Sequence, residues 1–489
     1  MEPRKNFSAA FSSHFKVCVE SYRPLHPHNC LNINSFPCIH ALSATYLGDT
    51  MKRNANWQIQ VLISFAMVFI CTASTVNARG ENTVVAWGYN GFGQTNVPVN
   101  LGACKQVDGG GNQTVALRND NSVIAWGSNQ QGQCNVPLNL GPCTQVTAGT
   151  NHTAAIRQNG IVVAWGDNSL GQCGNNLERV GGRTNDYNSV NGAAWVKTKS
   201  LGPCKLISAG ANHTLAIRQN GIVAAWGYNI YGQCGIPAEN TGYFGIWTKS
   251  ALGTCTQIAG GANFSLALRT SGFIAAWGFN GSGQCGPTNE RVAGSGMYWV
   301  RKSLGYCKQI SAGGDHALAL RADGKVIAWG SNTYGQCNVP QTIVNCVQTA
   351  AGFGNSLALQ SDGLVVAWGL NTSGQSTVPT NLGTCVSVAA GDFFSLAIQG
   401  TPPPTNVTAS NGSFTNQVAV RWGEVSGASS YFVFRAVNGS AAIHIGTTTS
   451  NTFTDFTGAS KTKYTYFVKA SSMELGASAL SFGVTGWRK

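Results

Sequence analysis

The sequence predicts an all-β protein, with a closed seven-bladed β-propeller followed by a smaller C-terminal β-sandwich. The tripeptide Ala-Trp-Gly occurs seven times, each time after an alternating apolar segment and before a turn that ends in Gly-x-Gly-Gln or a close variant of it. A second unit of the type Cys-x-x-Val-x-Ala-Gly also occurs seven times and leads into an apolar strand. The shortest repeats are about forty residues long, the length of one four-stranded propeller blade. The repeated tryptophans are Trp87, Trp126, Trp165, Trp226, Trp277, Trp329 and Trp368.

The two ends of the repeat array predict how the ring closes. The array begins with an Ala-Trp-Gly half at residues 84–88 and ends with the complementary half at residues 385–398. We therefore expect both ends to share one blade. We expect a closed ring of this kind to remove all sheet edges except at the joint. Residues 79–400 form the predicted propeller.

Composition supports an all-β fold and narrows the function classes. Charged residues make up 10% of the chain and there are 61 glycines, which favours short strands joined by tight turns over long helices or disorder. The formal net charge is +13, but the basic residues are scattered and form no run. Nucleic acid is therefore not predicted as a partner.

The first 78 residues lack the repeat pattern. We interpret residues 1–50 as unstructured or as an over-called start. Residues 51–78 resemble a secretory signal peptide, with Lys52 and Arg53 before an apolar stretch at 61–71 and small residues before Arg79. The prediction is a secreted or cell-surface protein. The alternative is that the segment is retained as a membrane anchor.

Cysteines recur at two positions of the repeat, which in an exported chain is typical of disulfides. We expect pairing within each connecting loop, because short local loops are easiest to close. The alternative joins Cys104 to Cys134 and shifts every later pair by one. Thr95 and Ser376 replace the first cysteine in the end repeats. The predicted pairs are Cys134–Cys143, Cys173–Cys204, Cys234–Cys255, Cys285–Cys307 and Cys337–Cys346.

Three consecutive repeats carry longer loops at the same point, between the two cysteines, and each loop combines aromatic with basic residues. Such residues dominate protein-binding hot spots. The alternative is that each tryptophan folds back and caps its own loop, with the basic side chains solvated. The candidate binding residues are Tyr187, Trp195, Lys197, Lys199, Tyr243, Trp247, Lys249, Tyr298, Trp299, Arg301 and Lys302.

The residues that recur in every blade are interpreted as structural. Tryptophan supplies apolar surface between blades and glycine permits the turns. His152, His213 and His316 share one repeat position, which other repeats fill with non-ligating residues. We expect packing and hydrogen bonding there, since zinc needs three or four converging ligands. No metal, cofactor or catalytic residue is predicted.

A proline-rich segment at residues 401–404 is expected to be a linker, and residues 405–489 to form a separate β-sandwich. Three alternating segments begin near Val418, Tyr431 and Tyr464. The segment resembles a fibronectin type III domain, with Trp422 in the core and Tyr464 as the corner tyrosine.

The repeats from about residue 81 to 400 are similar to those of the regulator of chromosome condensation propeller family. The stretch Val-Val-Ala-Trp-Gly-Tyr-Asn-Gly-Phe-Gly-Gln-Thr-Asn-Val-Pro at residues 84–98 most resembles the secreted members, among them propeller-type inhibitors of β-lactamase. This resemblance implies a binding protein. The guanine-nucleotide exchange activity of the nuclear founder is not expected here.

The predicted function is that of a secreted or surface-associated, non-enzymatic binding protein that uses one propeller face as an interaction platform. The expected partner is a protein or a glycan, and we expect a monomer. Two alternatives stay open. One is a hydrolase, for example a polysaccharide-active one, with its site at the propeller channel. The other is a structural cell-envelope or adhesion protein.

Overall fold

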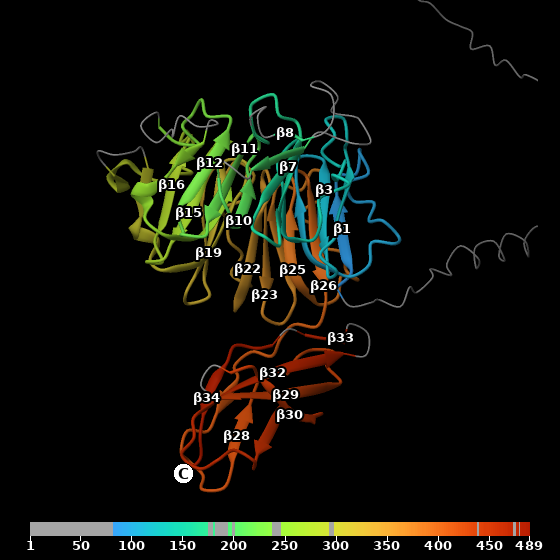
Figure 1. The fold of residues 1–489 in the computed structure, drawn as a ribbon, viewed down its shortest axis with the longest axis vertical. Helices are drawn as coiled ribbons and strands as arrows, with labels where there is room; N and C mark the ends of the chain where they lie inside the picture. The colour runs from blue at the N-terminus through green and yellow to red at the C-terminus, as the bar shows by residue number, and fades with distance from the viewer. Residues whose placement is uncertain are drawn as a thin grey trace, which may run out of the picture. The chain divides into compact units, whose positions relative to one another are not determined.

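The computed structural model describes residues 82–174, 179–180, 194–197, 201–236, 246–292, 298–437, 440–472, 476–478 and 480–489. Within them the chain is almost entirely β-structure, as predicted (Figure 1). Short 3-10 turns are η3 (Ser250–Leu252), η4 (Thr288–Glu290) and η5 (Lys302–Leu304). None of the helices in these ranges has the length and apolar character needed to cross a bilayer.

The propeller consists of seven antiparallel sheets among the described residues, which confirms the predicted fold. The inner strands of successive blades are β25 (Cys385–Ala390), β2 (Cys104–Gly109), β5 (Cys143–Ala148), β10 (Cys204–Ala209), β14 (Cys255–Gly260), β19 (Cys307–Ala312) and β22 (Cys346–Ala351). The middle strands are β26 (Phe394–Gln399), β3 (Gln113–Arg118), β6 (His152–Arg157), β11 (His213–Arg218), β15 (Phe264–Arg269), β20 (His316–Arg321) and β23 (Asn355–Gln360). The third strands are β1 (Val84–Gly88), β4 (Val123–Gly127), β7 (Val162–Gly166), β12 (Val223–Gly227), β16 (Ile274–Gly278), β21 (Val326–Gly330) and β24 (Val365–Gly369).

Three consecutive blades continue outward beyond the third strand. The added strands are β9 (Ala194–Lys197) with β8 (Arg179–Val180), β13 (Trp247–Thr248), and β18 (Tyr298–Arg301) with β17 (Arg291–Val292). They come from the long loops that the sequence singled out. The loops therefore complete their own blades, at least in part.

The ring closes through strands from opposite ends of the array. Strand β1 pairs with β26 in antiparallel register from Val84 opposite Ile398 to Gly88 opposite Phe394, and β26 pairs with β25 on its other side. This confirms the prediction that both ends share a blade.

The repeated tryptophans join neighbouring blades, which confirms their structural interpretation. Each indole Nε1 donates a hydrogen bond of 2.8–3.0 Å to the backbone carbonyl of the glutamine in the preceding blade's Gly-Gln turn. Trp126, for example, bonds the carbonyl of Gln94, and Trp87 bonds that of Gln375 across the closure. The same interaction therefore repeats around the whole ring.

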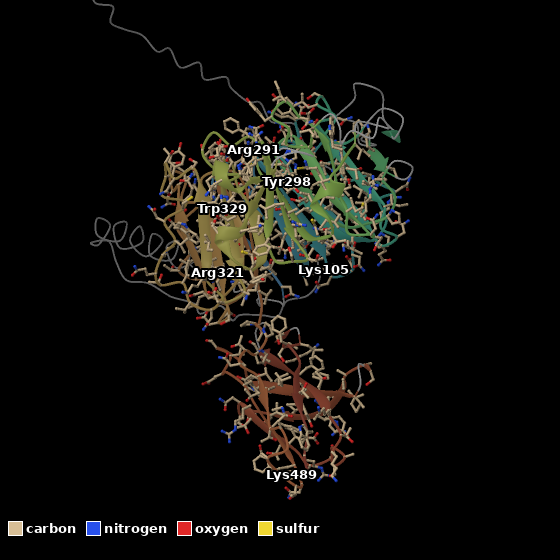
Figure 2. The ribbon with its side chains drawn as sticks, turned by 90° about the vertical axis from the view of Figure 1, so that its left-hand side faces the viewer. Lys105, Arg291, Tyr298, Arg321, Trp329 and Lys489 are labelled. Atoms are coloured by element: carbon tan, nitrogen blue, oxygen red, sulfur yellow. The ribbon has the colours of Figure 1, made fainter. Side chains whose placement is uncertain are left out.

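Strand direction gives the propeller two distinct faces. We call upper the face that carries the turns after the third strands, such as residues 89–94, and the turns from inner to middle strands. The lower face carries the starts of the inner strands and the turns from middle to third strands. Figure 2 shows Lys105 and Arg321 at the lower end of the blades and Arg291 at the opposite end.

The C-terminal segment forms a sandwich of two sheets. One contains β27 (Thr408–Ala409), β28 (Val418–Arg421) and β31 (Thr452–Asp455). The other contains β29 (Ser430–Val437), β30 (Ile443–Thr448), β32 (Tyr464–Ser472), β33 (Gly476–Ala477) and β34 (Val484–Gly486). Trp422 is buried between them, and the Tyr464 hydroxyl accepts a 2.8 Å hydrogen bond from the Ala459 amide. Both features agree with the expected core tryptophan and corner tyrosine.

Candidate functional site: the upper face of the propeller

The upper face presents exposed aromatic side chains from several blades. Tyr89, Phe92, Tyr231, Tyr334 and Phe353 are each between 39% and 49% exposed. Aromatic side chains combine large apolar area with few rotatable bonds, which is why they dominate binding hot spots. An exposed group of them on one face therefore marks a candidate interaction surface.

The repeat frame holds these aromatic tips rigidly. Three of them, at Phe92, Tyr231 and Tyr334, occupy the position two residues before the buried glutamine of the turn. In each case the glutamine Oε1 accepts a hydrogen bond of 2.9–3.0 Å from the backbone N–H of the aromatic residue. The backbone under each ring is thus fixed from inside the blade. A surface organised in advance loses less entropy when it binds.

Aromatic contacts extend this surface between blades. The rings of Tyr231 and Phe279, from neighbouring blades, lie 5.1 Å apart between centroids. The rings of Phe353 and Phe393, also from neighbouring blades, lie 5.6 Å apart. We define the upper aromatic group as Tyr89, Phe92, Tyr228, Tyr231, Phe279, Tyr334, Phe353 and Phe393.

A central channel of about 380 Å³ runs between the inner strands. Its upper end is a narrow collar in which backbone groups of adjacent blades bond directly, as the Gly111 amide does to the Gly149 carbonyl. A Cβ on Gly313 would lie only 2.2 Å from the Gly352 carbonyl oxygen. Glycine is therefore needed where blades approach this closely.

Two aspartates, Asp108 and Asp392, are the charged residues among those that line the channel. Burial raises the pKa of each carboxyl to about 6. The Asp108 carboxylate accepts hydrogen bonds of 2.9–3.0 Å from the Gly109 and Ala148 amides and the Thr147 hydroxyl. It thereby ties two blades together.

The histidines predicted to be structural are buried between blades. The Nε2 atoms of His152, His213 and His316 lie 2.9–3.0 Å from a hydroxyl oxygen of the next blade. Burial lowers the pKa of these imidazoles to about 4, 3 and 4. They are neutral hydrogen-bonding groups, as expected. Among the described residues no group of three or more His, Cys, Asp or Glu side chains could hold a metal ion.

The lower face is basic. Five middle strands end in arginine, and each of these arginines pairs in register with the cysteine that begins the inner strand. Three exposed lysines follow such cysteines, at Lys105, Lys205 and Lys308. We call the eight cations the lower basic ring. The arginines are Arg118, Arg157, Arg218, Arg269 and Arg321.

The tryptophans of the long loops are not exposed as binding hot-spot residues would be. Trp195, Trp247 and Trp299 stand in the added strands, each opposite the alanine of its own blade's Ala-Trp-Gly unit. Trp195 and Trp299 are buried and Trp247 is half-buried. This burial favours the capping alternative, since these rings contribute to the core.

Most of the other candidate residues that the structure describes are also buried. Lys249 lies over the ring of Trp277 at 5.1 Å, and Arg301 over Trp329 at 5.2 Å, in each case a tryptophan of a blade core. Arg301 also forms a 2.9 Å ion pair with Glu290. Of the remaining candidates, Tyr298 is buried and Lys302 is exposed. Lys197 is the last residue of β9. Tyr187, Lys199 and Tyr243 lie outside the described residues.

The disulfide prediction is corrected: no disulfide joins any two of the twelve cysteines that the structure describes. The first cysteine of each expected pair follows an upper-face turn, whereas the second begins an inner strand at the lower end. Disulfides need Cα atoms about 4.4–6.8 Å apart. The Cys337 thiol instead donates to the Ser331 carbonyl at 3.2 Å, and Ser376 makes the equivalent bond to Leu370 at 2.8 Å. The corrected residues are Cys134, Cys143, Cys173, Cys204, Cys234, Cys255, Cys285, Cys307, Cys337 and Cys346.

Sequence reasoning missed the upper aromatic group. It assigned a structural role to the repeated glycine and glutamine of the turn and left the positions between them unconsidered, although only the asparagine, glycine and glutamine of the turn are constant. The position two residues before the glutamine varies, from Phe92 and Tyr334 to Ser282 and Ser373. Variation inside a constant frame was the signal that could have located this surface.

Comparison with known proteins agrees with this geometry. The model of the regulator of chromosome condensation (RCC1) repeat matches residues 104–133, 143–172, 204–233, 307–336 and 346–375. The chain is 36% identical to Protein pim1 of Schizosaccharomyces pombe over 143 residues, 26% of each protein. It is 29% identical to the ultraviolet-B receptor UVR8 of Arabidopsis thaliana over 136 residues, 28% of this chain and 31% of that protein. The matches thus span about a quarter to a third of these relatives.

Solved structures share the propeller. Human WBSCR16 superposes with a TM-score of 0.54 at 18% identity, over 65% of this chain and 100% of that one. Prp20p of Saccharomyces cerevisiae superposes with a TM-score of 0.53 at 19% identity, over 65% of this chain and 91% of that one. Likeness at this level of identity establishes the fold. Residues 84–399 therefore form a seven-bladed β-propeller, and five stretches within it match the RCC1 repeat.

Proposed function

We propose that this protein is a non-catalytic binding protein whose upper aromatic group docks a partner protein. The observation that carries the proposal is the exposure of five aromatic rings on one face of a rigid scaffold. Repeat propellers of this fold serve as interaction platforms: Prp20p binds Gsp1p and histones, and a structure of Prp20 bound to Kap60 is known. Gsp1p, histones and Kap60 are partners of Prp20. For the present protein we propose only the chemical character of the partner, which is a protein surface with apolar pockets.

The test compares exposed aromatic residues on opposite faces. The propeller with Phe92→Ser and Tyr334→Ser is immobilised beside the wild type and used to capture proteins in a pull-down. The matched control is Tyr306→Ser, because Tyr306 is 63% exposed and precedes an inner strand on the lower face. We expect the upper variant to lose the captured partner and the control to keep it, with equal melting temperatures. Equal recovery by all three proteins would refute the proposal.

The raised pKa of two channel carboxyls favours a second candidate, hydrolysis at the channel. Carboxyl pairs that cleave glycosides face a shared substrate. The oxygens of Asp108 instead accept three hydrogen bonds from its own and the next blade, so this carboxyl has a structural role in joining the two blades. Binding is therefore better supported. Oligosaccharide cleavage that Asp392→Asn abolishes would reverse this preference.

Export is part of the same proposal. It is supported by the signal-like segment at 51–78. Fractionation of the native host, followed by sequencing of the mature N-terminus, tests it. A chain that starts at Arg79 outside the cytoplasm is the expected result, and an intact residue 51–78 segment in the cytoplasmic fraction would contradict it.

A further inference from the structure

An acidic side chain without a hydrogen-bonding partner among the described residues stands at the upper mouth of the channel. Asp392 lies in the turn that joins β25 to β26, immediately after the collar residue Gly391. Five of the other blades carry a glycine, alanine or threonine at this position, and the sixth carries Phe353. One sector of an otherwise small-residue rim therefore bears a carboxylate and an aromatic ring from adjacent blades.

The backbone holds this carboxylate in place while leaving its oxygens unused. The Asp392 amide donates a 3.1 Å hydrogen bond to the Gly110 carbonyl of the next blade, which fixes the turn. Among the described residues the Asp392 carboxylate makes no hydrogen bond or ion pair of its own. Its neighbour Phe393 contacts the ring of Phe353, so that aromatic surface borders the acid on one side.

The charge of the channel differs from that of the chain. The protein carries a formal net charge of +13, yet the described residues that line the channel include no lysine, arginine or histidine. With Asp108 and Asp392 as its ionisable groups, the channel is a negative site inside a positive protein. Charge complementarity therefore selects a cationic ligand.

The number of free oxygens decides which kind of cation fits. Calcium takes six to eight oxygen ligands, and magnesium requires an octahedral set. The oxygens of Asp108 are already engaged, so the mouth offers a single free carboxylate. One carboxylate beside an aromatic ring suits an organic monocation, which gains a charge-assisted hydrogen bond and a cation–π contact.

We propose that the upper channel mouth binds one basic side chain of a partner protein, with its guanidinium or ammonium group on Asp392 and its stem against Phe353. This inference rests on the proposed function and deepens it, because it specifies that the partner presents an arginine or lysine at the centre of its interface. The upper aromatic group, on the same face, then contacts other parts of the partner's surface.

The experiment uses N-acetylarginine amide as the probe and N-acetylcitrulline amide as its neutral equivalent of the same size. Saturation-transfer NMR measures the binding of each to the full chain. We expect saturable binding of the arginine compound alone, weakened at least tenfold by Asp392→Asn. The control is Asp362→Asn, an exposed aspartate on a lower-face turn, which should change nothing.

A pH series gives a second readout. Binding should weaken as the pH falls through about 6, because protonation of Asp392 removes its charge. Asp108 titrates in the same range, and it is the other ionisable group that lines the channel. Asp392→Asn should therefore remove most of the pH dependence, and a profile that this substitution leaves intact would overturn the assignment.

Other outcomes separate this inference from the proposed function. Equal binding of the arginine and citrulline probes, or unchanged binding by Asp392→Asn, overturns the cation site. If a captured partner is lost with Tyr334→Ser but binds Asp392→Asn as tightly as the wild type, the platform stands and only the cation site fails.

Discussion

The upper and lower faces of the propeller are built by the same repeat but differ in chemistry. On the upper face, the varied positions carry aromatic rings and the unpartnered Asp392. On the lower face, the lower basic ring combines arginines at the ends of five middle strands with three exposed lysines. The same contrast exists along one strand: β20 begins with the buried, neutral His316 and ends with Arg321. The repeat thus determines the scaffold, and the residues that vary within it determine what each face can bind.

The largest expected effect is a difference in the free energy of unfolding between a glycine substitution in the tight collar and one in an open lower turn. Gly313→Ala places a methyl group 2.2 Å from a backbone oxygen of the next blade, which cannot move away without opening the ring. We expect a loss of about 3 kcal/mol or more in the free energy of unfolding, measured by denaturant titration. Gly324→Ala, on a lower turn with φ +84° and open space, should cost only about 1–2 kcal/mol.

Equal losses from the two glycine substitutions would show that the collar is no more constrained than the turns. The assignment of glycine to close blade contact would then be wrong.

The next effect concerns acid stability. His316 keeps a folded-state pKa of about 4 against 6.5 in the unfolded chain, so the unfolded chain takes up the proton first. Stability is therefore lost as the pH falls from 6.5 towards 4. His316→Asn should remove about 2–3 kcal/mol of that loss. Asparagine is the matched replacement because Asn355 bonds Ser395 at the equivalent position.

Unfolding free energies at pH 7 and 4.5 provide the measurement. Arg321→Gln, at the other end of the same strand, copies Gln360 of the neighbouring blade and should leave the acid profile unchanged. If both variants flatten the profile alike, the acid sensitivity does not come from the upper end of the strand.

A smaller effect tests the lower basic ring. We expect replacement of its three lysines by threonine, the residue found at Thr144 and Thr256, to lower the salt concentration at which the protein leaves a cation exchanger. The control is a variant in which three exposed lysines of the sandwich, Lys461, Lys463 and Lys489, are replaced by threonine, because it has the same net charge. If this control shifts elution by the same amount, the lower face is not a concentrated basic site.

The smallest effect concerns the upper thiols. Cys337→Ser should change the unfolding free energy by less than about 1 kcal/mol, because Ser376 makes the same bond naturally. Cys346→Ser, in an apolar cluster at the lower end, should cost about 1–3 kcal/mol. Loss of a native disulfide would cost about 2–5 kcal/mol from either cysteine. A cost of that size for Cys337→Ser would restore the disulfide interpretation.

The sequence predicted the blades, their number and the closure, because each repeat encodes one local sheet and Trp87 and Phe394 mark complementary halves of a blade. It could not locate the upper aromatic group, since exposure depends on how separate turns assemble around the ring. The cysteine prediction was wrong because their even spacing comes from the repeat itself. From the sequence, Trp195 could either bind a partner or cap its own loop. The pairing of β9 with β7, which the sequence does not reveal, favours capping.

The shared closing blade also constrains when this protein can fold. Strand β1 pairs with β26, whose residues follow it by more than three hundred positions in the sequence. During synthesis, β1 must wait with unpaired backbone groups until the ribosome has released the last inner and middle strands. An apolar strand edge exposed for that long invites association with other nascent chains. We therefore expect chaperone demand to be highest just before residues 394–399 emerge.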